Sequence, residues 1–572
     1  KEIFMQLISK KEAIRLCFEQ KDSSYMESEV QKLDDMLDEL EQHYSLAIYD
    51  LQDPSRMKRL FGRVFGKIFK VFFMGPFAKK QIAYKRQGIE HASQPSGDTG
   101  GNLRSYGKDE RTTGGKRMNI GFDSVGILGP ASKNRGIGNY TKSQFLKMAE
   151  IDKENQYFFL NTYEADFSLS EFMEDASNLH EEFYFFGKGN FLLHDRINYE
   201  LVGKVVKRFL KDNQIDVFYM TSPFDENMTL YRKEWFEGVT VVATVYDIIP
   251  YMRKEQYFPR FSRAKQYYEM RIDMLKWVDQ ILVISESVKQ DMIKYMNFAP
   301  EKIDVIWGAV DERFKEIPVA DETEKEIREK FGITDSFIIC TGGADGRKNL
   351  DGLIRAFGAM PTELKEQYQL VIVCKLSQET VDDFMKLAKE SDADGRVICT
   401  NFVTDEELLI LYNLAHLTAF PSKYEGFGLP VVESWACGTP VLTSNNSSLV
   451  EVGGDGAVLV NPNDVSDITR GLVQALSETD LEELLQKGKK RLERFQWKVV
   501  AEDTLKFIQD AYEKHEKTNQ DLTKEEKPEE IYADKKWLSR LYAERIIGQK
   551  YTSLEIWHLA RMIAYADGVD KD

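Results

Sequence analysis

The stretch that decides the fold is Tyr424-Glu425-Gly426-Phe427-Gly428-Leu429-Pro430-Val431-Val432-Glu433-Ser434-Trp435-Ala436-Cys437-Gly438-Thr439-Pro440-Val441. Its first glycines allow backbone N–H groups to approach a ligand closely. Pro430 is typical of the first residue of a helix, and Gly438 is typical of the residue that ends one. The stretch therefore predicts a loop leading into a short helix, whose free N–H groups would bind phosphate.

Two carboxylates frame this loop. Glu425 lies just before the expected helix, and Glu433 follows eight positions later, in its expected first turn. A first-turn acid ordinarily does no more than complement the helix dipole, and a loop acid is ordinarily solvated. Here both occur together with the glycines, with Pro430 and with a second turn at Gly438-Thr439-Pro440. We therefore interpret them as parts of one binding site.

The stretch closely resembles the signature of the group 1 retaining glycosyltransferases, enzymes of the GT-B fold whose two glutamates are separated by seven residues. The resemblance implies that Glu425 contacts the sugar of a nucleotide-sugar donor and that Glu433 holds the ribose hydroxyls. The helix amides of Phe427, Gly428 and Leu429 are then expected to stabilise the donor diphosphate.

A second glycine-rich loop runs from Thr341 to Asn349, after an apolar strand and before a helix. It contains Gly343 and ends in two cations, Arg347 and Lys348, which suit the neutralisation of a departing diphosphate. The alternative is a surface cation pair on an ordinary loop. The resemblance implies that Lys348 is the family's diphosphate-binding lysine. Many members have an earlier arginine where this chain has Gly342, so Arg347 is expected to share the task.

The first half of the chain has a glycine loop of its own, Arg135-Gly136-Ile137-Gly138-Asn139-Tyr140. Two glycines in a strand–helix turn are weak evidence by themselves. The resemblance implies that the loop faces the donor phosphates through Gly136 and Gly138 and the acceptor through Asn139.

A further turn, Thr244-Val245-Tyr246-Asp247-Ile248-Ile249-Pro250, matches the place where the family usually has a His-Asp pair. Tyr246 stands in the place of the histidine. A tyrosine forms hydrogen bonds with sugar hydroxyls but does not titrate near neutral pH. Asp247 is expected on the acceptor side of the site as a catalytic residue, and Tyr246 as a contact to the acceptor or sugar.

The base of the nucleotide is expected at the turn Asn401-Phe402-Val403-Thr404, where family members use backbone contacts, so we assign the base edge to Val403. No DxD motif and no His/Cys cluster with ligand spacing stands out. We therefore expect an enzyme that needs neither a metal nor a cofactor.

The resemblance covers about residues 118–513. Apolar strands alternate with helices in this region, which predicts an α/β fold with parallel sheets covered on both faces. We expect a first, acceptor-binding Rossmann-like domain over 118–313 and a second, donor-binding one over 314–513, facing each other across a cleft. The first strand is expected over 118–128, and a closing helix over 497–513 is expected to cross back to the first domain.

Composition narrows the class of partner. The chain has 572 residues, a net charge of −17 and 42% hydrophobic residues, so it has room for several cores, and its charge argues against nucleic acid as a partner. The five cysteines are scattered, which indicates reduced thiols in a cytosolic setting. We find neither a signal peptide nor an apolar run of membrane-spanning length. The chain begins at Lys1 without Met, so we expect that it is part of something longer.

Residues 1–87 are expected to be helical, and two features stand out. Apolar residues at heptad spacing over 26–47 predict either a homodimeric coiled coil or a helix that packs on its own domain. Residues 56–86 contain many Phe and basic residues and no acid, which favours a helix lying on an anionic membrane surface over a core helix with a solvated basic face.

Two segments flank the catalytic region. Residues 88–117 are rich in Gly, Ser, Thr and charges, and they predict a flexible linker. Residues 514–572 predict a further linker and a helical extension to which we assign no chemistry.

The expected function is transfer of a sugar, a hexose or deoxyhexose such as mannose or rhamnose, from a nucleotide sugar to a hydroxyl with retention of configuration. The acceptor would be a glycan, lipid-linked or cell-surface polysaccharide at the cytoplasmic face of the plasma membrane, where the protein would be peripheral. Two alternatives stay open: a GT-B hydrolase or epimerase of nucleotide sugars, and a non-catalytic membrane or assembly scaffold that keeps the fold.

Overall fold

The computed structural model describes residues 117–520 except 134–135, 164–166, 185–195, 226–227 and 259–262. The helices expected over 1–87, including the dimer segment 26–47 and the membrane segment 56–86, lie outside the described residues. So do nearly all of the linker expected over 88–117 and the part of the C-terminal extension beyond residue 520.

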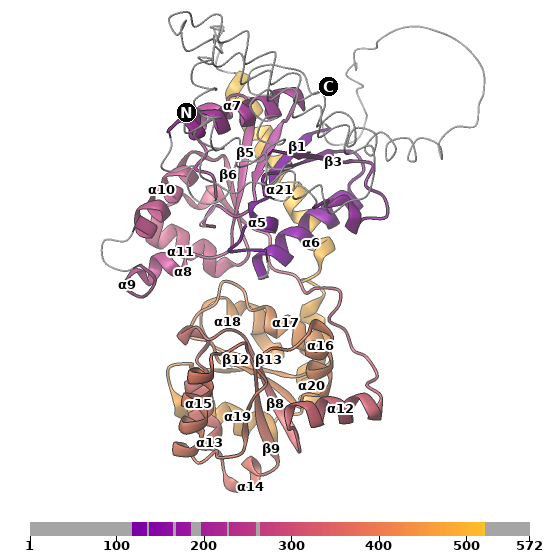
Figure 1. The fold of residues 1–572 in the computed structure, drawn as a ribbon, viewed down its shortest axis with the longest axis vertical. Helices are drawn as coiled ribbons and strands as arrows, with labels where there is room; N and C mark the ends of the chain where they lie inside the picture. Colours follow the sequence, from indigo (N-terminus) through magenta and orange to yellow (C-terminus); the bar gives the residue numbers. More distant parts are fainter. Residues whose placement is uncertain are drawn as a thin grey trace, which may run out of the picture. The chain divides into compact units, whose positions relative to one another are not determined.

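The first half of the described chain is built on a parallel sheet of seven strands in the order β3-β2-β1-β4-β5-β6-β7 (Figure 1). The strands are β1 (Asn119–Asp123), β2 (Gln156–Asn161), β3 (Leu179–Phe183), β4 (Val217–Met220), β5 (Thr240–Val245), β6 (Gln280–Val283) and β7 (Ile303–Val305). The helices are α5 (Val125–Leu128), α6 (Gly136–Ile151), α7 (Arg196–Asp212), α8 (Ile249–Met252), α9 (Lys254–Tyr257), α10 (Arg263–Trp277) and α11 (Glu286–Met296).

The second half has a parallel sheet of six strands in the order β10-β9-β8-β11-β12-β13. The strands are β8 (Ser336–Thr341), β9 (Tyr368–Val373), β10 (Val397–Cys399), β11 (Leu417–Phe420), β12 (Val441–Ser444) and β13 (Ala457–Val460). The helices are α12 (Asp321–Phe331), α13 (Leu350–Gly358), α14 (Thr362–Lys365), α15 (Gln378–Glu390), α16 (Asp405–Leu414), α17 (Leu429–Ala436), α18 (Ser447–Gly453), α19 (Val465–Ser477) and α20 (Leu481–Leu492).

Burial explains why these segments form strands. Every residue of β5 and of β9 is buried, as expected for parallel strands covered by helices on both faces. Both sheets are doubly wound, because the strand order reverses beside β1 in the first sheet and beside β8 in the second. Ligands of such sheets bind at the carboxyl ends of the strands at this reversal. In the second sheet the two strands there are β8 and β11, and the loops that follow them are the two glycine-rich loops predicted from the sequence.

A long helix, α21 (Trp497–Gln520), links the two halves. It begins among residues of the second half, since Trp497 and Val500 belong to the same buried cluster as Phe427 and Trp435. Farther along, Ile508 and its buried neighbours Ala501, Ala511 and Tyr512 join the core of the first half. The predicted crossing of this helix back to the first half is confirmed.

One predicted element is wrong. The strand expected over 118–128 ends at Asp123, and α5 follows it. The carboxylate of Asp123 accepts hydrogen bonds from the Thr221 hydroxyl at 2.5 Å and from the Val125 amide at 3.2 Å, which turns the chain out of the sheet. The boundaries drawn at 118–313 and 314–513 stay predictions, although each range contains one of the two sheets.

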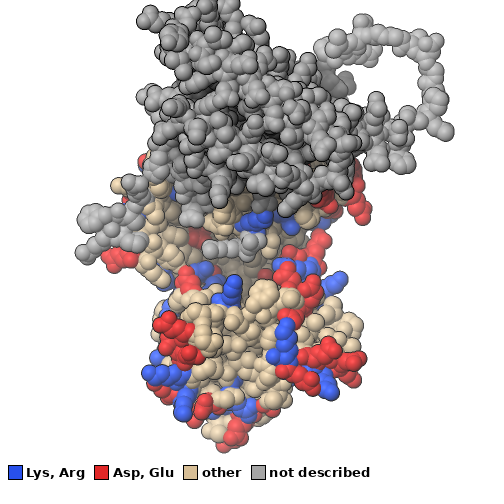
Figure 2. Space-filling model, viewed as in Figure 1, with Lys and Arg blue, Asp and Glu red and all other residues tan. Residues whose placement is uncertain are grey.

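Charges of both signs are interspersed over the second half on the face shown in Figure 2, with uncharged surface between them. The acidic excess of the chain is therefore not gathered into one field on that face. Within the described part of the chain, no helix is both long enough and apolar enough to cross a bilayer.

Candidate active site

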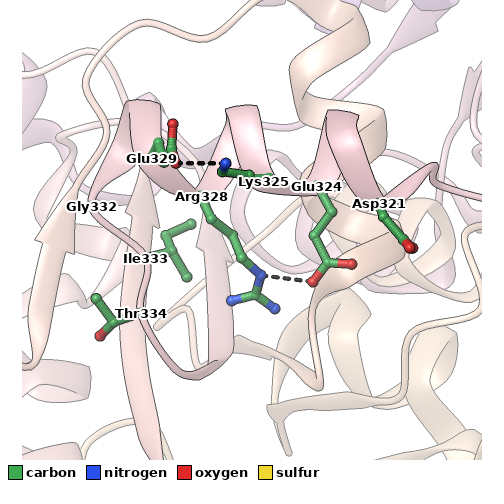
Figure 3. Close-up of a pocket in the computed structure, with 8 residues that line it drawn as sticks. All are labelled: Asp321, Glu324, Lys325, Arg328, Glu329, Gly332, Ile333 and Thr334. Atoms are coloured by element: carbon green, nitrogen blue, oxygen red, sulfur yellow. Dashed lines mark hydrogen bonds and ion pairs between the residues drawn. The ribbon is translucent and has the colours of Figure 1, made fainter.

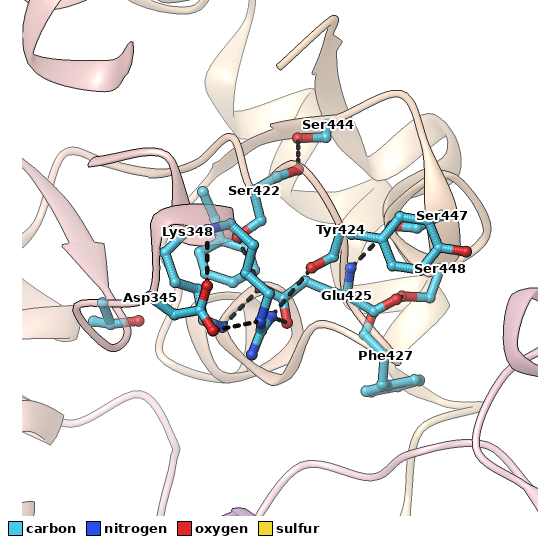
Figure 4. Close-up of polar contacts among 12 residues, drawn as sticks. Asp345, Lys348, Ser422, Tyr424, Glu425, Phe427, Ser444, Ser447 and Ser448 are labelled. Carbon is cyan, nitrogen blue, oxygen red and sulfur yellow. Dashed lines mark hydrogen bonds and ion pairs between the residues drawn. The ribbon is translucent and has the colours of Figure 1, made fainter. Parts of the chain in front are cut away.

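Glu425 lies at the centre of the candidate site, in the loop between β11 and α17, with only 7% of its surface exposed. Its Oε1 accepts hydrogen bonds from Lys348 Nζ and from Ser422 Oγ, both at 2.7 Å (Figure 4). Its Oε2 lies 2.5 Å from Nη1 of Arg347. The structure thus brings together the glutamate and the two cations that the sequence predicted, from loops almost 80 residues apart.

A buried carboxylate is costly unless charges and hydrogen bonds compensate it. Glu425 has two cationic partners and a hydroxyl, so its charge is compensated. Oδ2 of Asp345 also lies 3.6 Å from Nε of Arg347, so two carboxylates face the two cations. Arg347 also donates to the Tyr424 carbonyl at 3.1 Å. Burial alone would lower the pKa of Arg347, but the carboxylates of Glu425, Asp247 and Asp345 together outweigh that effect and the pKa is raised.

The loop after β8 holds the two cations in a single turn of 3-10 helix, η5 (Gly346–Lys348). Asp345 caps this turn, since its Oδ1 accepts from the Arg347 amide at 2.9 Å. Nζ of Lys348 lies 4.9 Å from the centre of the Phe420 ring, a cation–π distance. Gly343 is exposed on the same loop, and a Cβ on it would meet nothing within 4 Å.

Gly342 has a φ of +151°, a backbone conformation that residues with a side chain rarely adopt. A Cβ built on it would lie 3.4 Å from Cδ of Lys348. An arginine here would therefore have a strained backbone, and its Cβ would lie in contact with Lys348. Arg347, five positions later, supplies the second cation from the far end of the loop.

The loop from Glu425 into α17 has the predicted form. Gly428 is the N-cap with φ of +117°, and a Cβ on it would lie 2.5 Å from Cδ2 of Leu449. The Ser448 hydroxyl donates to the carbonyls of Glu425 at 2.9 Å and of Phe427 at 2.7 Å, which holds the loop backbone in place. The amides of Phe427, Gly428 and Leu429 are thereby fixed at the start of the helix.

Two details of the sequence interpretation are wrong. The helix begins at Leu429, so Pro430 is its second residue, and Glu433 lies beyond the first turn, which contains no acid. Glu433 therefore does not serve as a first-turn acid for the helix dipole. It is partly buried, and its Oε2 accepts from the Tyr412 hydroxyl at 3.0 Å. Burial raises the pKa of Glu433 to about 7.

The stretch expected as the glycine loop of the first half is helical instead, because α6 begins at Gly136, and its first turn contacts the signature stretch. A Cβ on Gly136 would lie 3.5 Å from Cδ1 of Leu429. A Cβ on Gly138 would lie 2.5 Å from the Ser132 carbonyl oxygen, so only glycine fits there. Asn139 is exposed. The two residues before α6, 134–135, lie outside the described residues.

Tyr246 and Asp247 follow β5 and lie beside the loop of Glu425, since a Cβ on Gly426 would lie 2.6 Å from the Tyr246 carbonyl and 3.0 Å from Cβ of Asp247. The hydroxyls of Tyr246 and Thr141 form a hydrogen bond of 2.6 Å. Burial raises the pKa of Tyr246 well above its ordinary value of 10. Asp247 accepts from the Ile249 amide at 2.9 Å. Burial raises the pKa of Asp247, while the charge of Arg347 opposes the rise. Their roles towards a sugar or acceptor stay predictions.

Val403 lies in the turn between β10 and α16 and is partly buried. The turn runs into a capping box, in which Thr404 and Glu407 satisfy each other's backbone amides. Phe402 beside it is 70% exposed. No contact tests the assignment of the base to Val403, so it stays a prediction.

Ser422 and Tyr412 belong to the site, and sequence reasoning missed both. Ser422 lies three residues before Glu425, inside the loop, and its hydroxyl was visible in the sequence as a possible partner. Tyr412 has no such signal, because it comes from α16 and reaches Glu433 only through the packing of α16 on α17.

A separate open groove of about 450 Å³ runs along α12 (Figure 3). Charged side chains line it, and Arg328 and Glu324 form an ion pair at 2.7 Å there. It contains none of the residues predicted for the site.

Within the described ranges, no three His, Cys, Asp or Glu side chains are grouped so that they could hold a metal ion. The expected independence of metal stays a prediction.

Two doubly wound parallel sheets, with ligand-binding loops after the strands where the order reverses, define a protein of the GT-B class. Sucrose-phosphate synthase from Thermosynechococcus elongatus shares this fold with the chain. The TM-score is 0.54, the match covers 70% of this chain and 100% of that one, and the sequence identity is 17%. Residues 323–492 match the family model of Glycosyl transferases group 1, and residues 173–314 match that of Glycosyltransferase Family 4. The chain belongs to the group 1 glycosyltransferases.

Curated relatives match part of the chain. The serotype-specific mannosyltransferase WbdA of Escherichia coli is 35% identical over 240 residues, which are 41% of this chain and 29% of that protein. The O-antigen chain mannosyltransferase B of Escherichia coli is 28% identical over 266 residues, which are 46% of this chain and 68% of that protein. The match therefore spans less than a third of the length of WbdA.

Proposed function

We propose that this protein is a retaining glycosyltransferase that moves mannose from a nucleotide sugar to a hydroxyl of a glycan acceptor. The observation that carries the proposal is the bridging of Arg347 and Lys348 by Glu425, beside the N-terminus of the helix that carries Glu433. The cations and helix amides after β8 and β11 suit the diphosphate of a nucleoside diphosphate sugar. The two carboxylates suit the hydroxyls of its sugar and of its ribose.

The residues have distinct tasks in this proposal. Lys348, Arg347 and the amides of Phe427–Leu429 stabilise the charge that develops on the diphosphate as its bond to the sugar C1 breaks. Glu425 accepts hydrogen bonds from the sugar hydroxyls, and Glu433 accepts them from the ribose. The acceptor oxygen bonds to C1 on the face that the phosphate leaves, and its proton passes to a phosphate oxygen. The configuration at C1 is therefore retained.

The choice of sugar and acceptor rests on relatives. WbdA and the O-antigen chain enzyme are named mannosyltransferases, and the latter acts on an O-antigen chain. We propose mannose as the sugar on this ground, with a lipid-linked or cell-surface glycan as the acceptor.

The test supplies GDP-, UDP- and dTDP-linked sugars with membrane glycolipid and measures the release of nucleoside diphosphate. We expect release from one mannosyl donor that depends on the acceptor, and a product whose anomeric proton coupling equals that of the donor. Lys348→Ala should lower kcat about 10²–10³-fold, as does the loss of one group that stabilises transition-state charge. Lys386→Ala, a lysine on the exposed face of α15, is the matched control and should be unchanged.

Glu425→Gln separates binding from transfer. Without donor, Glu425 forms ion pairs with both Arg347 and Lys348. Removing its charge should therefore leave the binding of nucleoside diphosphate undiminished, while turnover falls at least 10²-fold. If the wild type releases nucleoside diphosphate without any acceptor, the protein is a hydrolase. If the folded wild type releases none from any donor, the proposal is contradicted and a non-catalytic scaffold is favoured.

The membrane location is a separate part of the proposal and rests on residues 56–86 of the sequence alone. Their basic and Phe-rich pattern suits an anionic lipid surface. Phe65→Glu and Phe69→Glu together should release the protein from anionic liposomes in a flotation assay. Unaltered recovery of the double variant with the liposomes would show that this segment is not the anchor.

A further inference from the structure

Tyr412 donates a hydrogen bond to Glu433, the carboxylate that we assign to the ribose of the donor. Tyr412 lies on α16, is fully buried, and its ring meets that of Phe314 edge to face at 5.7 Å. Its backbone carbonyl also accepts a hydrogen bond from the hydroxyl of Thr439, which lies in the turn after α17. Ring and backbone are both fixed, so the hydroxyl has one position.

That hydroxyl joins two other elements. It lies 2.8 Å from Oγ1 of Thr341, the last residue of β8, and 3.0 Å from Oε2 of Glu433 on α17. A tyrosine hydroxyl has one proton to donate. The carboxylate only accepts when ionised, so Tyr412 donates to Glu433 and Thr341 donates to Tyr412. The three groups form a directed chain that ends on the carboxylate.

The state of Glu433 decides what it can bind. A carboxylate accepts hydrogen bonds from two vicinal hydroxyls only when it is ionised, and burial opposes that ionisation by raising its pKa to about 7. The hydrogen bond from Tyr412 favours the ionised form. The other charges that act on Glu433 are Arg313 and Asp311 from the segment before α12, and Lys348 from the loop after β8. Cys437 at the end of its own helix also interacts with it.

We propose that Tyr412, supported by Thr341, is a positioning residue that orients Glu433 and keeps it ionised for the ribose of the donor. Thr341 is followed directly by the loop that ends in Arg347 and Lys348. The chain of hydroxyls therefore ties the ribose carboxylate to the start of the diphosphate loop. The inference rests on the proposed function, because it assumes that a nucleotide occupies the site.

The test compares ligands that differ in the ribose. Calorimetry measures the binding of GDP, UDP and dTDP, and of inorganic pyrophosphate, to the full chain and to Tyr412→Phe. We expect the variant to bind the preferred nucleotide roughly tenfold more weakly, the effect of one hydrogen bond to a charged group, and pyrophosphate unchanged. In turnover, the donor KM should rise by a similar factor while kcat stays within about twofold.

The pH dependence is the second readout. Nucleotide affinity of the wild type should increase as pH rises through about 7 and Glu433 loses its proton. In Tyr412→Phe the midpoint should move to higher pH, because the ionised form has lost its donor. The titration of the ligand is common to both proteins and cancels in the comparison. Thr341→Val should shift the midpoint in the same direction by less.

Tyr368→Phe is the matched control, since Tyr368 is also a buried tyrosine of the second half, and its hydroxyl lies 3.2 Å from His416, which is not a residue of the site. It should change neither the ratio of nucleotide to pyrophosphate affinity nor the pH midpoint. A wild type that binds none of the three nucleotides would overturn the proposed function, and this inference with it. A wild type that binds one of them, with Tyr412→Phe equal to it in affinity and pH midpoint, would overturn the inference alone.

Discussion

At the scale of single residues, the site depends on acids held where water reaches them poorly. Glu425 keeps its charge beside two cations and a hydroxyl. Burial raises the pKa of Glu433 to about 7, and its single hydroxyl donor, Tyr412, only partly opposes that rise. The same environment that prepares Glu433 for ribose therefore makes the stability of the protein depend on pH.

Glu433→Gln should reveal this dependence. The folded pKa of Glu433 is raised to about 7 from 4.5, so its contribution to stability is full below pH 4.5 and is lost as pH rises through 7. Glutamine does not titrate, so between pH 5 and 8 the variant should gain about 1–3 kcal/mol relative to the wild type, a range that allows for partial exposure of the side chain.

Guanidinium unfolding midpoints at pH 5, 6, 7 and 8 measure the effect. Glu366→Gln, on an exposed carboxylate, should show no such trend. A constant difference between Glu433→Gln and wild type across this range would mean that Glu433 titrates near its ordinary value when folded.

At the scale of elements, α17 is held in place by its tryptophan. Trp435 is fully buried, and a Cβ on Gly488 of α20 would lie 2.3 Å from its Nε1. A Cβ on Gly456 would lie 2.7 Å from the Gly488 backbone. Glycines at these two positions allow α17, which carries Glu433, to lie close to α20 and to the turn before β13.

Gly488→Ala should therefore destabilise the protein by about 1–3 kcal/mol, the usual effect of overpacking a core, and should weaken nucleotide binding as α17 shifts. Gly346→Ala is the control for stability, because a Cβ there meets nothing within 4 Å and its backbone is not left-handed. Thermal unfolding and nucleotide calorimetry on both variants check the expectation. Equal melting temperatures would show that α17 and α20 have room between them.

The elements also show what sequence reasoning can reach. The alternation of apolar strands with helices over 118–513 is visible in the sequence because buried parallel strands, such as β9 and β11, need apolar residues on both faces. The edge strand β3, Leu-His-Glu-Glu-Phe, carries too many charges to be recognised this way. The glycine loops were recognisable because backbone conformation and residue type are linked locally. The contact of Tyr412 with Glu433 was not, because it depends on how two helices pack.

At the scale of the whole molecule, α21 contributes to both cores. Ile508 is fully buried among residues of the first sheet, about 200 positions after that sheet ends. Ile508→Ala should cost about 2–5 kcal/mol, the usual effect of a cavity in a core. Glu502→Ala, on the exposed side of the same helix, should cost little.

Hydrogen exchange followed by mass spectrometry locates that loss. Ile508→Ala should speed exchange in peptides of β1 and β2, since these strands pack in the core that Ile508 completes. Faster exchange confined to α21 itself would show that the first half is stable without this helix.

The bridge of Glu425 to Arg347 and Lys348 also bears on selectivity in a crowded cell. A pair of unmatched cations would attract every abundant anion, including free phosphate and ATP, and the enzyme would spend much of its time blocked. With Glu425 and Asp345 in place, two carboxylates face the two cations of the empty site, within a chain of net charge −17. Simple anions should be poor competitors, and the spent nucleotide should leave readily once its sugar is gone.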